Sequence, residues 1–494
     1  MPAQLTTKAQ VNGYRFLLRR LDHALVRRDV RMLHDPMRSQ SRSLMVGAVL
    51  GLIIVAGAAI MSFLRPQGAI GDSLIVTGKQ SGAMYVVVAS ADGGKALHPV
   101  LNLASARLIA GSPAEPNSVK DAKLGSMPRG PLLGIPGAPA AMPGSVQGAR
   151  SDWTLCETTQ LSITGSAAGA SGGTTTVIAG RPALGDRIAA TGRDDALLVR
   201  RGDKTFLVYN GLRTEVDTAN SVIARTLNLS GQRPRPMGTG FLGATTQVPP
   251  LAVPTIANAG TPGPGKLANV PVGGVISVGA DNYIVLADGV QKITPFTTQL
   301  LRNADSQGMR EIAIVPPDFL DRIPVLTTLP IDDFPVMAPR ILAPEDAPVA
   351  CVGWSKAPGT AASQGKSPDG PDERSKLTLL AGQRLPLPDS AKPVSLATAD
   401  GTGDRVDTVY LPPTSGEFVQ VTGSDPGSPR RESLFYVADS GIRYGIPDAA
   451  VAAVLGLGDK PRLAPWAIVG QLVPGPTLSV KDALTSYDSL PSGR

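Results

Sequence analysis

One uninterrupted apolar segment constrains this chain more than any other feature of its sequence. Residues 43–64 read SLMVGAVLGLIIVAGAAIMSFL and contain no charged side chain. At about 1.5 Å per residue, a helix of this length crosses a hydrocarbon core of about 30 Å. A cleavable signal peptide has a shorter apolar region and rarely begins so far into a chain. The sequence therefore predicts a retained transmembrane helix at 43–64.

The charge before this segment predicts its orientation. Residues 1–42 carry nine Lys and Arg side chains against three Asp, a net charge of +6, while the whole chain carries only +7. Because basic residues collect on the cytoplasmic side of a membrane, we expect 1–42 in the cytoplasm and the chain after Leu64 outside it. Since the basic excess is confined to one stretch, it does not indicate nucleic-acid binding.

Residues 1–42 also combine apolar and basic side chains in a helical pattern. The apolar positions are Val11, Tyr14, Leu18, Leu21 and Leu25. A basic amphipathic helix beside a membrane rests on anionic headgroups or docks on a cytoplasmic partner, and the sequence leaves both open. The candidate docking residues are Tyr14, Arg15, Leu18, Arg19, Arg20, Arg27 and Arg28.

Two glycines within the apolar segment suggest a helix contact. Gly47 and Gly51 form a G-x-x-x-G pair, whose small surface lets a second helix approach closely. Small residues also recur by chance in apolar runs. The sequence therefore leaves two possibilities for Gly47 and Gly51: a contact with a second helix, or a chance recurrence of small residues.

The chain has only two cysteines, and both lie in the part expected outside the cytoplasm. Cys156 and Cys351 occur in WTLC and CVGW, each close to a tryptophan. An even count in an oxidising compartment favours a disulfide over a metal site, which needs more ligands. Closing so long a loop contributes about 4 to 5 kcal/mol in the chain-entropy model. We expect Trp153 and Trp354 to pack around this disulfide.

Four stretches after the apolar segment resemble one another. They begin at Tyr85, Phe206, Tyr283 and Phe435. Each has an apolar run, a turn with Gly, a second short run and a segment of helical spacing, which predicts strand, turn, strand and helix. In the last stretch we expect Asp448 to cap a helix that runs to about Leu455. Their irregular separation argues against a regular solenoid.

These features predict an α+β fold. It has a single N-terminal transmembrane helix and an elongated extracytoplasmic domain of four related strand-turn-strand-helix repeats around a β-rich core. The predicted boundaries are 1–42 for the cytoplasmic basic amphipathic segment, 43–64 for the transmembrane helix, 72–140 for the first module, 145–200 for the first part of the core, 201–250 for the second module, 251–335 for a linker and the third module, 340–425 for the second part of the core, 426–485 for the fourth module and 486–494 for the C-terminal tail.

A catalytic constellation is not evident in the sequence. The stretch GTAASQGKS offers Gly365, Lys366 and Ser367 as a phosphate-binding loop, but five residues separate Gly359 from Gly365 where that motif has four. Pro368 also disfavours the helix that should follow. We expect a partly buried structural role for His98, and no ligand spacing suggests zinc. We therefore predict no catalytic residue, cofactor or metal, although enzyme activity stays an open question.

Several long motifs resemble the EccB family, the single-pass membrane subunits of the type VII (ESX) secretion system of mycobacteria and related actinobacteria. They are QVNGYRFLLRRLDHALVRRDVRMLHDPMRSQSR, LHPVLNLASARLIAG, GPLLGIPGAP, GIRYGIPD and PWAIVGQLVPGPTLS, in this order. Cys156 and Cys351 fall where the family's disulfide would lie. The resemblance covers essentially the whole chain and implies a periplasmic domain with four repeat modules around a β-rich core.

The resemblance also implies a function. Such a subunit would be a core structural component of the secretion complex in the inner membrane and would organise assembly through its periplasmic domain. The implied partners are other EccB copies, an FtsK-like ATPase, a polytopic membrane subunit, a further membrane subunit, a subtilisin-like membrane protease and inner-membrane lipid, with no nucleic acid. Two alternatives remain. One is an ATPase subunit, a label that family members carry, and the other is an anchor that binds the cell envelope.

Overall fold

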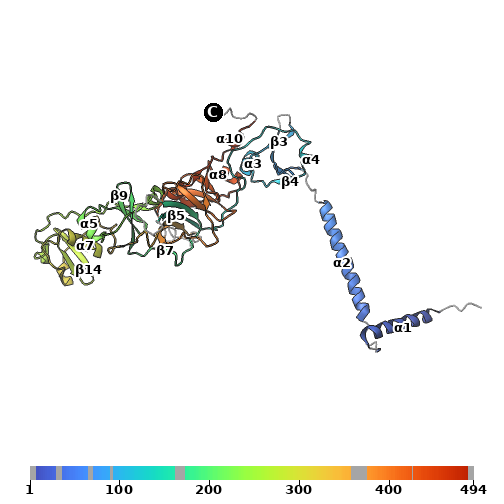
Figure 1. Cartoon of the computed structure of the whole chain (residues 1–494), viewed down its shortest axis with the longest axis horizontal. Helices are drawn as coiled ribbons and strands as arrows, with labels where there is room; N and C mark the ends of the chain where they lie inside the picture. Colours follow the sequence, from blue (N-terminus) through green and yellow to red (C-terminus); the bar gives the residue numbers. More distant parts are fainter. Residues whose placement is uncertain are drawn as a thin grey trace, which may run out of the picture. The chain divides into compact units, whose positions relative to one another are not determined.

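The structure is a computed structural model, shown as a ribbon in Figure 1. It describes residues 7–28, 30, 36–64, 70–89, 93–161, 173–357, 375–425 and 427–487. The chain divides into two compact units, Met1–Gly71 and Asp72–Arg494.

The first unit contains two helices, α1 (Lys8–Arg27) and α2 (Pro36–Leu64). At the start of α1 the Thr7 backbone N–H donates to the Gln10 side chain at 3.0 Å, and Arg28 ends the helix with a left-handed φ of 57°. Within α2, Arg42–Met61 is long and apolar enough to cross a membrane, and no other described helix is. The predicted transmembrane segment is thus the larger part of α2.

The second unit is rich in β-structure, and four of its sheets share one order of strands. In each sheet three strands form an antiparallel meander, a helix follows, and a further strand pairs parallel to the first. The first sheet comprises β1 (Ile75–Gly78), β2 (Met84–Ala89), β3 (Lys95–Pro99), α3 (Leu103–Ala110) and β4 (Asn117–Val119), followed by α4 (Asp121–Leu124).

The three other sheets of this kind carry additional short elements. One comprises β8 (Asp195–Arg201), β9 (Lys204–Tyr209), β10 (Leu212–Glu215), α5 (Ser221–Thr226), β11 (Arg235–Pro236), α6 (Thr239–Ala244), β12 (Thr246–Gln247) and β17 (Arg340–Ile341). The next comprises β13 (Val275–Val278), β14 (Asp281–Leu286), β15 (Gly289–Ile293), α7 (Pro295–Ala304) and β16 (Ala313–Ile314), with the 3₁₀ helices η1 (Gly265–Leu267) and η2 (Pro317–Leu320) beside it. The last comprises β22 (Gly416–Thr422), β23 (Leu434–Ala438), β24 (Ile442–Ile446), α8 (Ala449–Val454), β25 (Arg462–Pro465), α9 (Trp466–Val469), β26 (Val473–Pro474) and α10 (Val480–Ala483).

Local sequence explains the turns and caps of these sheets. Asn210 and Gly211 join β9 to β10 with φ of 48° and 79°, the two left-handed positions of a tight hairpin turn. The first residue before each main helix accepts a backbone N–H with its side chain, as Asn102, Asn220, Thr294 and Asp448 do. The expected Asp448 cap is therefore present, and its helix ends at Val454.

Two sheets begin earlier in the chain than the sequence suggested. β8 starts at Asp195, inside the segment 145–200, and β22 starts at Gly416, inside the segment 340–425. Both strands pair with the hairpin that follows them. In sequence, an apolar strand of one sheet looks like an apolar strand of the adjacent sheet. Its sheet can be assigned only when the strand to which it hydrogen-bonds is known.

The fifth sheet has seven strands and contains the cysteines. Its order is β20-β21-β6-β5-β18-β19-β7. The strands are β5 (Ser151–Thr159), β6 (Gly173–Ala179), β7 (Ile188–Ala190), β18 (Val349–Lys356), β19 (Lys376–Gly382), β20 (Val394–Ser395) and β21 (Val406–Tyr410). Because β5 pairs with β18, two segments far apart in the sequence form the centre of this sheet.

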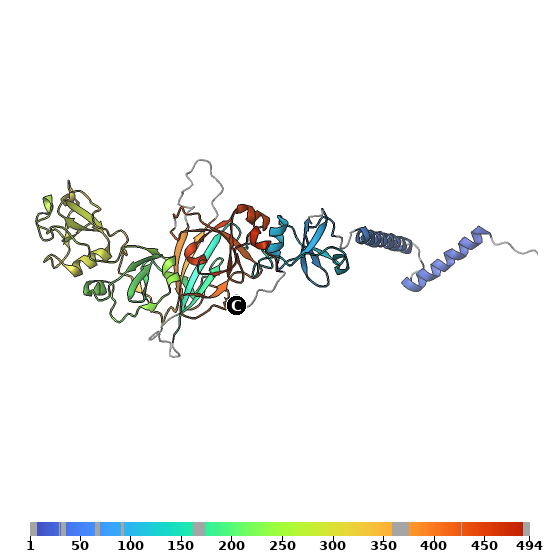
Figure 2. The same ribbon diagram turned by 90° about the horizontal axis from the view of Figure 1, so that it is seen from above.

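Contacts link the sheets of the second unit in succession. Arg107 of α3 donates to the Leu455 carbonyl at 2.8 Å, and Ser151 of β5 donates to the Leu463 carbonyl at 2.7 Å. Phe241 of α6 packs in the cluster of the seven-stranded sheet. Phe296 of α7 packs in the cluster of β8 and β9. Figures 1 and 2 show these neighbours within the second unit.

Candidate functional site

The predicted docking residues of the first unit lie on α1, apart from Arg28, which follows it. Tyr14 and Leu18 are one turn apart, and their exposed fractions are 65% and 47%. The arginines of this group are exposed as well: Arg15, Arg19, Arg20, Arg27 and Arg28. The helix therefore presents an apolar row and basic side chains that other described residues of its unit leave uncovered.

Gly47 and Gly51 lie one turn apart on α2. A Cβ atom added at either position would meet no described atom within 4 Å. The surrounding apolar side chains of α2, such as Val46 and Leu50, are more than half exposed. This surface can accept lipid or another helix.

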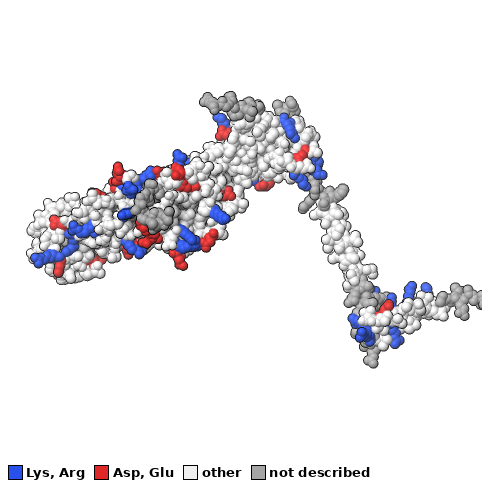
Figure 3. All heavy atoms as spheres, viewed as in Figure 1, with Lys and Arg blue, Asp and Glu red and all other residues white. Residues whose placement is uncertain are grey.

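An exposed apolar patch lies where the chain end meets the first sheet. We call Leu101, Val480 and Leu484 the α10 patch; their exposed fractions are 43%, 41% and 52%. Val480 and Leu484 are one helical turn apart, and the Gly134 N–H donates to the Thr485 carbonyl at 3.3 Å. A Cβ at Gly134 would lie 3.2 Å from the Leu101 Cβ, which places Leu101 beside this junction. Figure 3 shows charged side chains of both signs spread over the second unit. On α10 the exposed Lys481 and Asp482 lie between Val480 and Leu484.

A disulfide between β5 and β18 marks the centre of the seven-stranded sheet. Cys156 faces Cys351 in the antiparallel register, with 4.0 Å between their Cα atoms. Both side chains are fully buried. The bond therefore joins two strands that already exchange backbone hydrogen bonds.

The two faces of this sheet have different surroundings. The inner face carries Trp153, Leu155, Val352 and Trp354, which join one large cluster with residues of the neighbouring sheets and of α6 and α9. The outer face carries the disulfide in a smaller cluster that comprises Cys156, Ile178, Ile188, Val349, Cys351 and Leu380, with Leu385, Leu387 and Tyr410 packed against it. Leu385 and Leu387 lie in the loop that follows β19, and Tyr410 ends β21 of the same sheet.

The two tryptophans do not pack around the disulfide, so this expectation was wrong. Trp153 and Trp354 are paired across β5 and β18, but they lie on the inner face. Side chains on a strand alternate between faces, and each tryptophan is three residues from its cysteine. An odd separation places the two side chains on opposite faces.

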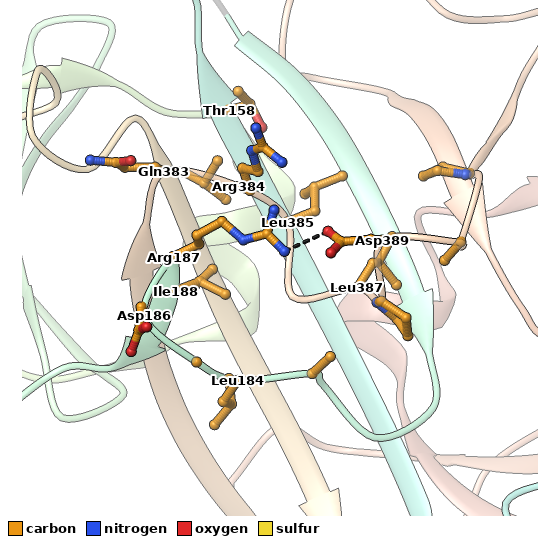
Figure 4. A pocket seen from close by; sticks show the side chains of 16 residues that line it. Thr158, Leu184, Asp186, Arg187, Ile188, Gln383, Arg384, Leu385, Leu387 and Asp389 are labelled. Carbon is orange, nitrogen blue, oxygen red and sulfur yellow. Dashed lines mark hydrogen bonds and ion pairs between the residues drawn. The ribbon is translucent and has the colours of Figure 1, made fainter.

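A cavity of about 850 Å³ opens on the outer face next to the disulfide cluster. Its floor includes Ile188, Val349, Leu385 and Leu387, the same residues that contact the disulfide cluster. Its walls are the segments 183–188 and 383–393 (Figure 4). The Gln383 N–H donates to the Arg187 carbonyl at 2.7 Å, which joins these two segments at their base. The volume lies in the range of small-ligand sites.

Charged groups line the rim of this cavity, which we call the outer-face cavity. Arg187 donates to Asp389 at 2.5 Å from wall to wall, as Figure 4 shows. Arg384 has no hydrogen-bond or ion-pair partner among the residues that the structure describes. Leu184 on the opposite segment is 51% exposed. No sequence pattern indicates this cavity, because Arg187 and Asp389 on its two walls are 202 positions apart in the chain.

A buried carboxyl group lies on the inner face. Both oxygens of Glu157 accept the Gly238 N–H at 2.9 Å. Burial raises the pKa of Glu157 to about 8, against the opposing effects of this hydrogen bond and of Arg201. Gly238 must be glycine here, because a Cβ would lie 1.8 Å from the Gly403 carbonyl. Glu157 follows Cys156 directly in the strand 151–159, which holds one other acidic residue, Asp152, and this position was the signal that could have identified it.

The described residues contain no recognisable catalytic centre. His98 lies on β3, where its Nδ1 is 3.2 Å from the Pro131 carbonyl oxygen. No group of three or more His, Cys, Asp or Glu side chains that could hold a metal ion occurs in the described part of the chain. Gly365, Lys366 and Ser367 lie outside the described residues.

Known proteins resemble this chain along almost its full length. The family model described as "Type VII secretion system ESX-1, transport TM domain B" matches residues 3–492. The chain is 38% identical to "ESX-3 secretion system ATPase EccB3" of Mycolicibacterium smegmatis, over 98% of this chain and 91% of that protein. It is 36% identical to "ESX-5 secretion system ATPase EccB5" of Mycobacterium tuberculosis, over 99% and 94%.

Solved structures also resemble the whole fold. A chain of an intact ESX-5 inner membrane complex matches with a TM-score of 0.71 and 34% identity, over 100% of this chain and 98% of that one. A chain of an EccB3 dimer from the ESX-3 core complex matches with a TM-score of 0.69 and 35% identity, over 84% and 100%.

Proposed function

This chain belongs to the EccB family of type VII secretion membrane subunits, and we propose that it organises the assembly of such a complex in the inner membrane. The main support is the match to a chain of an intact ESX-5 inner membrane complex. This match covers 100% of the present chain, so it includes both the candidate membrane helix and the β-rich unit. Two parts of the chain could bind other subunits in this role. One is the exposed surface of α1 and α2, and the other is the large second unit that contains the sheets.

We propose that α1 is cytoplasmic and that the second unit is periplasmic. The net charge of +6 before residue 43 supports this orientation. A disulfide in the second unit also agrees with an oxidising compartment. Maleimide labelling of single-cysteine reporters before and after α2 in intact cells tests it, and a reporter after α2 that stays protected would overturn it.

We further propose that four copies of one module build most of the second unit. The support is the common order of three antiparallel strands, a helix and a strand parallel to the first. A side-chain-capped helix in each of the four sheets adds to it. In this interpretation the modules are variants of one association surface arranged around the seven-stranded sheet.

The proposed partners are other copies of this chain and the remaining membrane subunits of the complex. These would comprise an FtsK-like ATPase, a polytopic subunit, a further membrane subunit and a subtilisin-like protease. The basic and apolar rows of α1 suit a cytoplasmic partner or anionic lipid. A relative forms an EccB3 dimer. We propose the α10 patch as a surface for the corresponding contact here, because its three side chains are apolar and exposed.

Extraction of the native complex tests the assembly role. Native mass spectrometry after detergent extraction should find this chain in a large heteromeric assembly, and a lone monomer would overturn the proposal. Leu101→Glu with Leu484→Glu should reduce association of copies, because the charges must lose water at a contact. Ile314→Glu is the matched control, since Ile314 is 86% exposed on the distant β16.

A further inference from the structure

We propose that the outer-face cavity binds an extended peptide segment of a partner protein, one that carries a carboxylate side chain next to an aliphatic side chain. This site goes beyond the assembly role, which does not require any cavity. Three features of the cavity support this binding: a preformed floor, an arginine that has no partner among the described residues, and a lining with both polar and apolar side chains.

The floor of the cavity is preformed. Ile188 and Val349 are buried, and both contact the cluster that contains the disulfide. The walls are joined at two places, because the Ala183 N–H donates to the Pro386 carbonyl at 2.9 Å and the Gln383 N–H donates to the Arg187 carbonyl at 2.7 Å. A ligand therefore does not need to order these segments, which lowers the entropic cost of binding.

The rim favours a carboxylate. Arg384 presents a guanidinium without a partner among the described residues, while Arg187 already pairs with Asp389. A guanidinium matches a carboxylate in geometry and can donate two parallel hydrogen bonds to it. Figure 4 shows Asp186 at the far end of the cavity from Arg384, so it does not neutralise this arginine.

The rest of the lining favours a peptide. Leu184 is 51% exposed and lines the cavity together with Leu385 and Leu387, so an aliphatic side chain of a ligand would cover apolar surface there. The Thr158 side chain also lines the cavity, and its hydroxyl can donate to and accept from a peptide backbone. A lipid acyl chain would leave this hydroxyl unmatched, which costs binding free energy.

Peptide binding to the full chain in lipid nanodiscs tests the proposal. The probe is a fluorescent seven-residue peptide with a central Leu-Glu pair, and the matched peptide has Leu-Gln. We expect the first peptide to bind at least about tenfold more tightly, as measured by fluorescence anisotropy. Arg384→Ala should remove this preference, and Arg384→Lys should retain part of it. Arg193→Ala is the control, because Arg193 is exposed and does not line the cavity.

Leu184→Glu provides an independent variant. It places a negative charge on the wall and should weaken the Leu-Glu peptide more than the Leu-Gln peptide, because like charges repel. Equal affinity for the two peptides would overturn the proposal, as would Arg384→Ala binding like Arg193→Ala. Displacement of the peptide by oleate with higher affinity, insensitive to Arg384→Ala, would assign the cavity to a lipid instead.

Discussion

The inner and outer faces of the seven-stranded sheet bury similar strands in different ways. The inner face is closed by side chains from the neighbouring sheets, and Trp153 and Trp354 are completely or almost completely buried there. The outer face is covered by loops, which leave a cavity of about 850 Å³ beside a disulfide. This difference shows that the disulfide lies on the face whose apolar cluster is the smaller of the two. A covalent bond can hold strands together on a face that must stay open to a ligand.

Trp153→Ala should give the largest loss of stability. The indole is fully buried and its Nε1 donates to Ser151 at 3.1 Å. Removal of a buried Trp side chain leaves a cavity and typically costs about 3 to 5 kcal/mol. Hydrogen exchange of the β5 amides in the full chain measures the loss as a lower opening free energy.

Trp466→Ala is the matched control for this prediction. Trp466 is 43% exposed and stacks on Phe435 with ring centroids 5.8 Å apart. Its removal should cost about 1 kcal/mol, the usual value of an aromatic pair with partial burial. Equal losses at Trp153 and Trp466 would contradict the assignment of the inner face as the main core.

Removal of the disulfide should give a smaller loss, centred on the outer face. Cys156→Ala with Cys351→Ala leaves the backbone pairing of β5 and β18 in place but removes a crosslink between positions 195 residues apart. We expect a loss of about 2 to 4 kcal/mol, the usual measured range for a disulfide, which is below the roughly 4 to 5 kcal/mol of the chain-entropy model. The same exchange measurement checks it, and faster exchange in β19 and β7 is also expected. Unchanged exchange in all four strands would show that loop packing alone holds this face.

The pH dependence of stability should report on the inner face alone, because Glu157 lies on that face. Burial raises the pKa of Glu157 from 4.5 to about 8, so the folded chain retains this proton where the unfolded chain loses it. The opening free energy of β5 should therefore fall as pH rises from about 4.5 to about 8, at most about 1.4 kcal/mol per pH unit. Glu157→Gln should flatten this slope. Glu432→Gln, at an exposed position, should keep it.

The sequence predicted the membrane helix and the mixed α+β class because these depend on local patterns. A charge-free apolar run is visible residue by residue, and the Asp448 cap precedes its helix directly. The sheet membership of β8 and β22 was not visible, because it depends on pairing with later strands. The face of each tryptophan could have been found from the sequence, since an odd spacing on a strand reverses the face.

The outer-face cavity could not be predicted for a related reason. Arg187 and Asp389 are 202 positions apart, and neither belongs to a recognisable motif. The pairing of β19 with β7, together with hydrogen bonds between the two loops, brings their segments together. A site made of two loops on one sheet thus becomes visible only when the sheet order is known.

The smallest effect is expected for the ion pair across the cavity. Arg187 and Asp389 are exposed, with 46% and 77% of their side-chain surfaces accessible. Exposed ion pairs contribute about 0.2 to 1 kcal/mol, so Arg187→Ala and Asp389→Ala should each change stability by less than about 1 kcal/mol. A double-mutant cycle of these two substitutions measures their coupling. A coupling above about 2 kcal/mol would contradict the contrast between the faces, because the outer face would then depend on its rim as the inner face depends on its core.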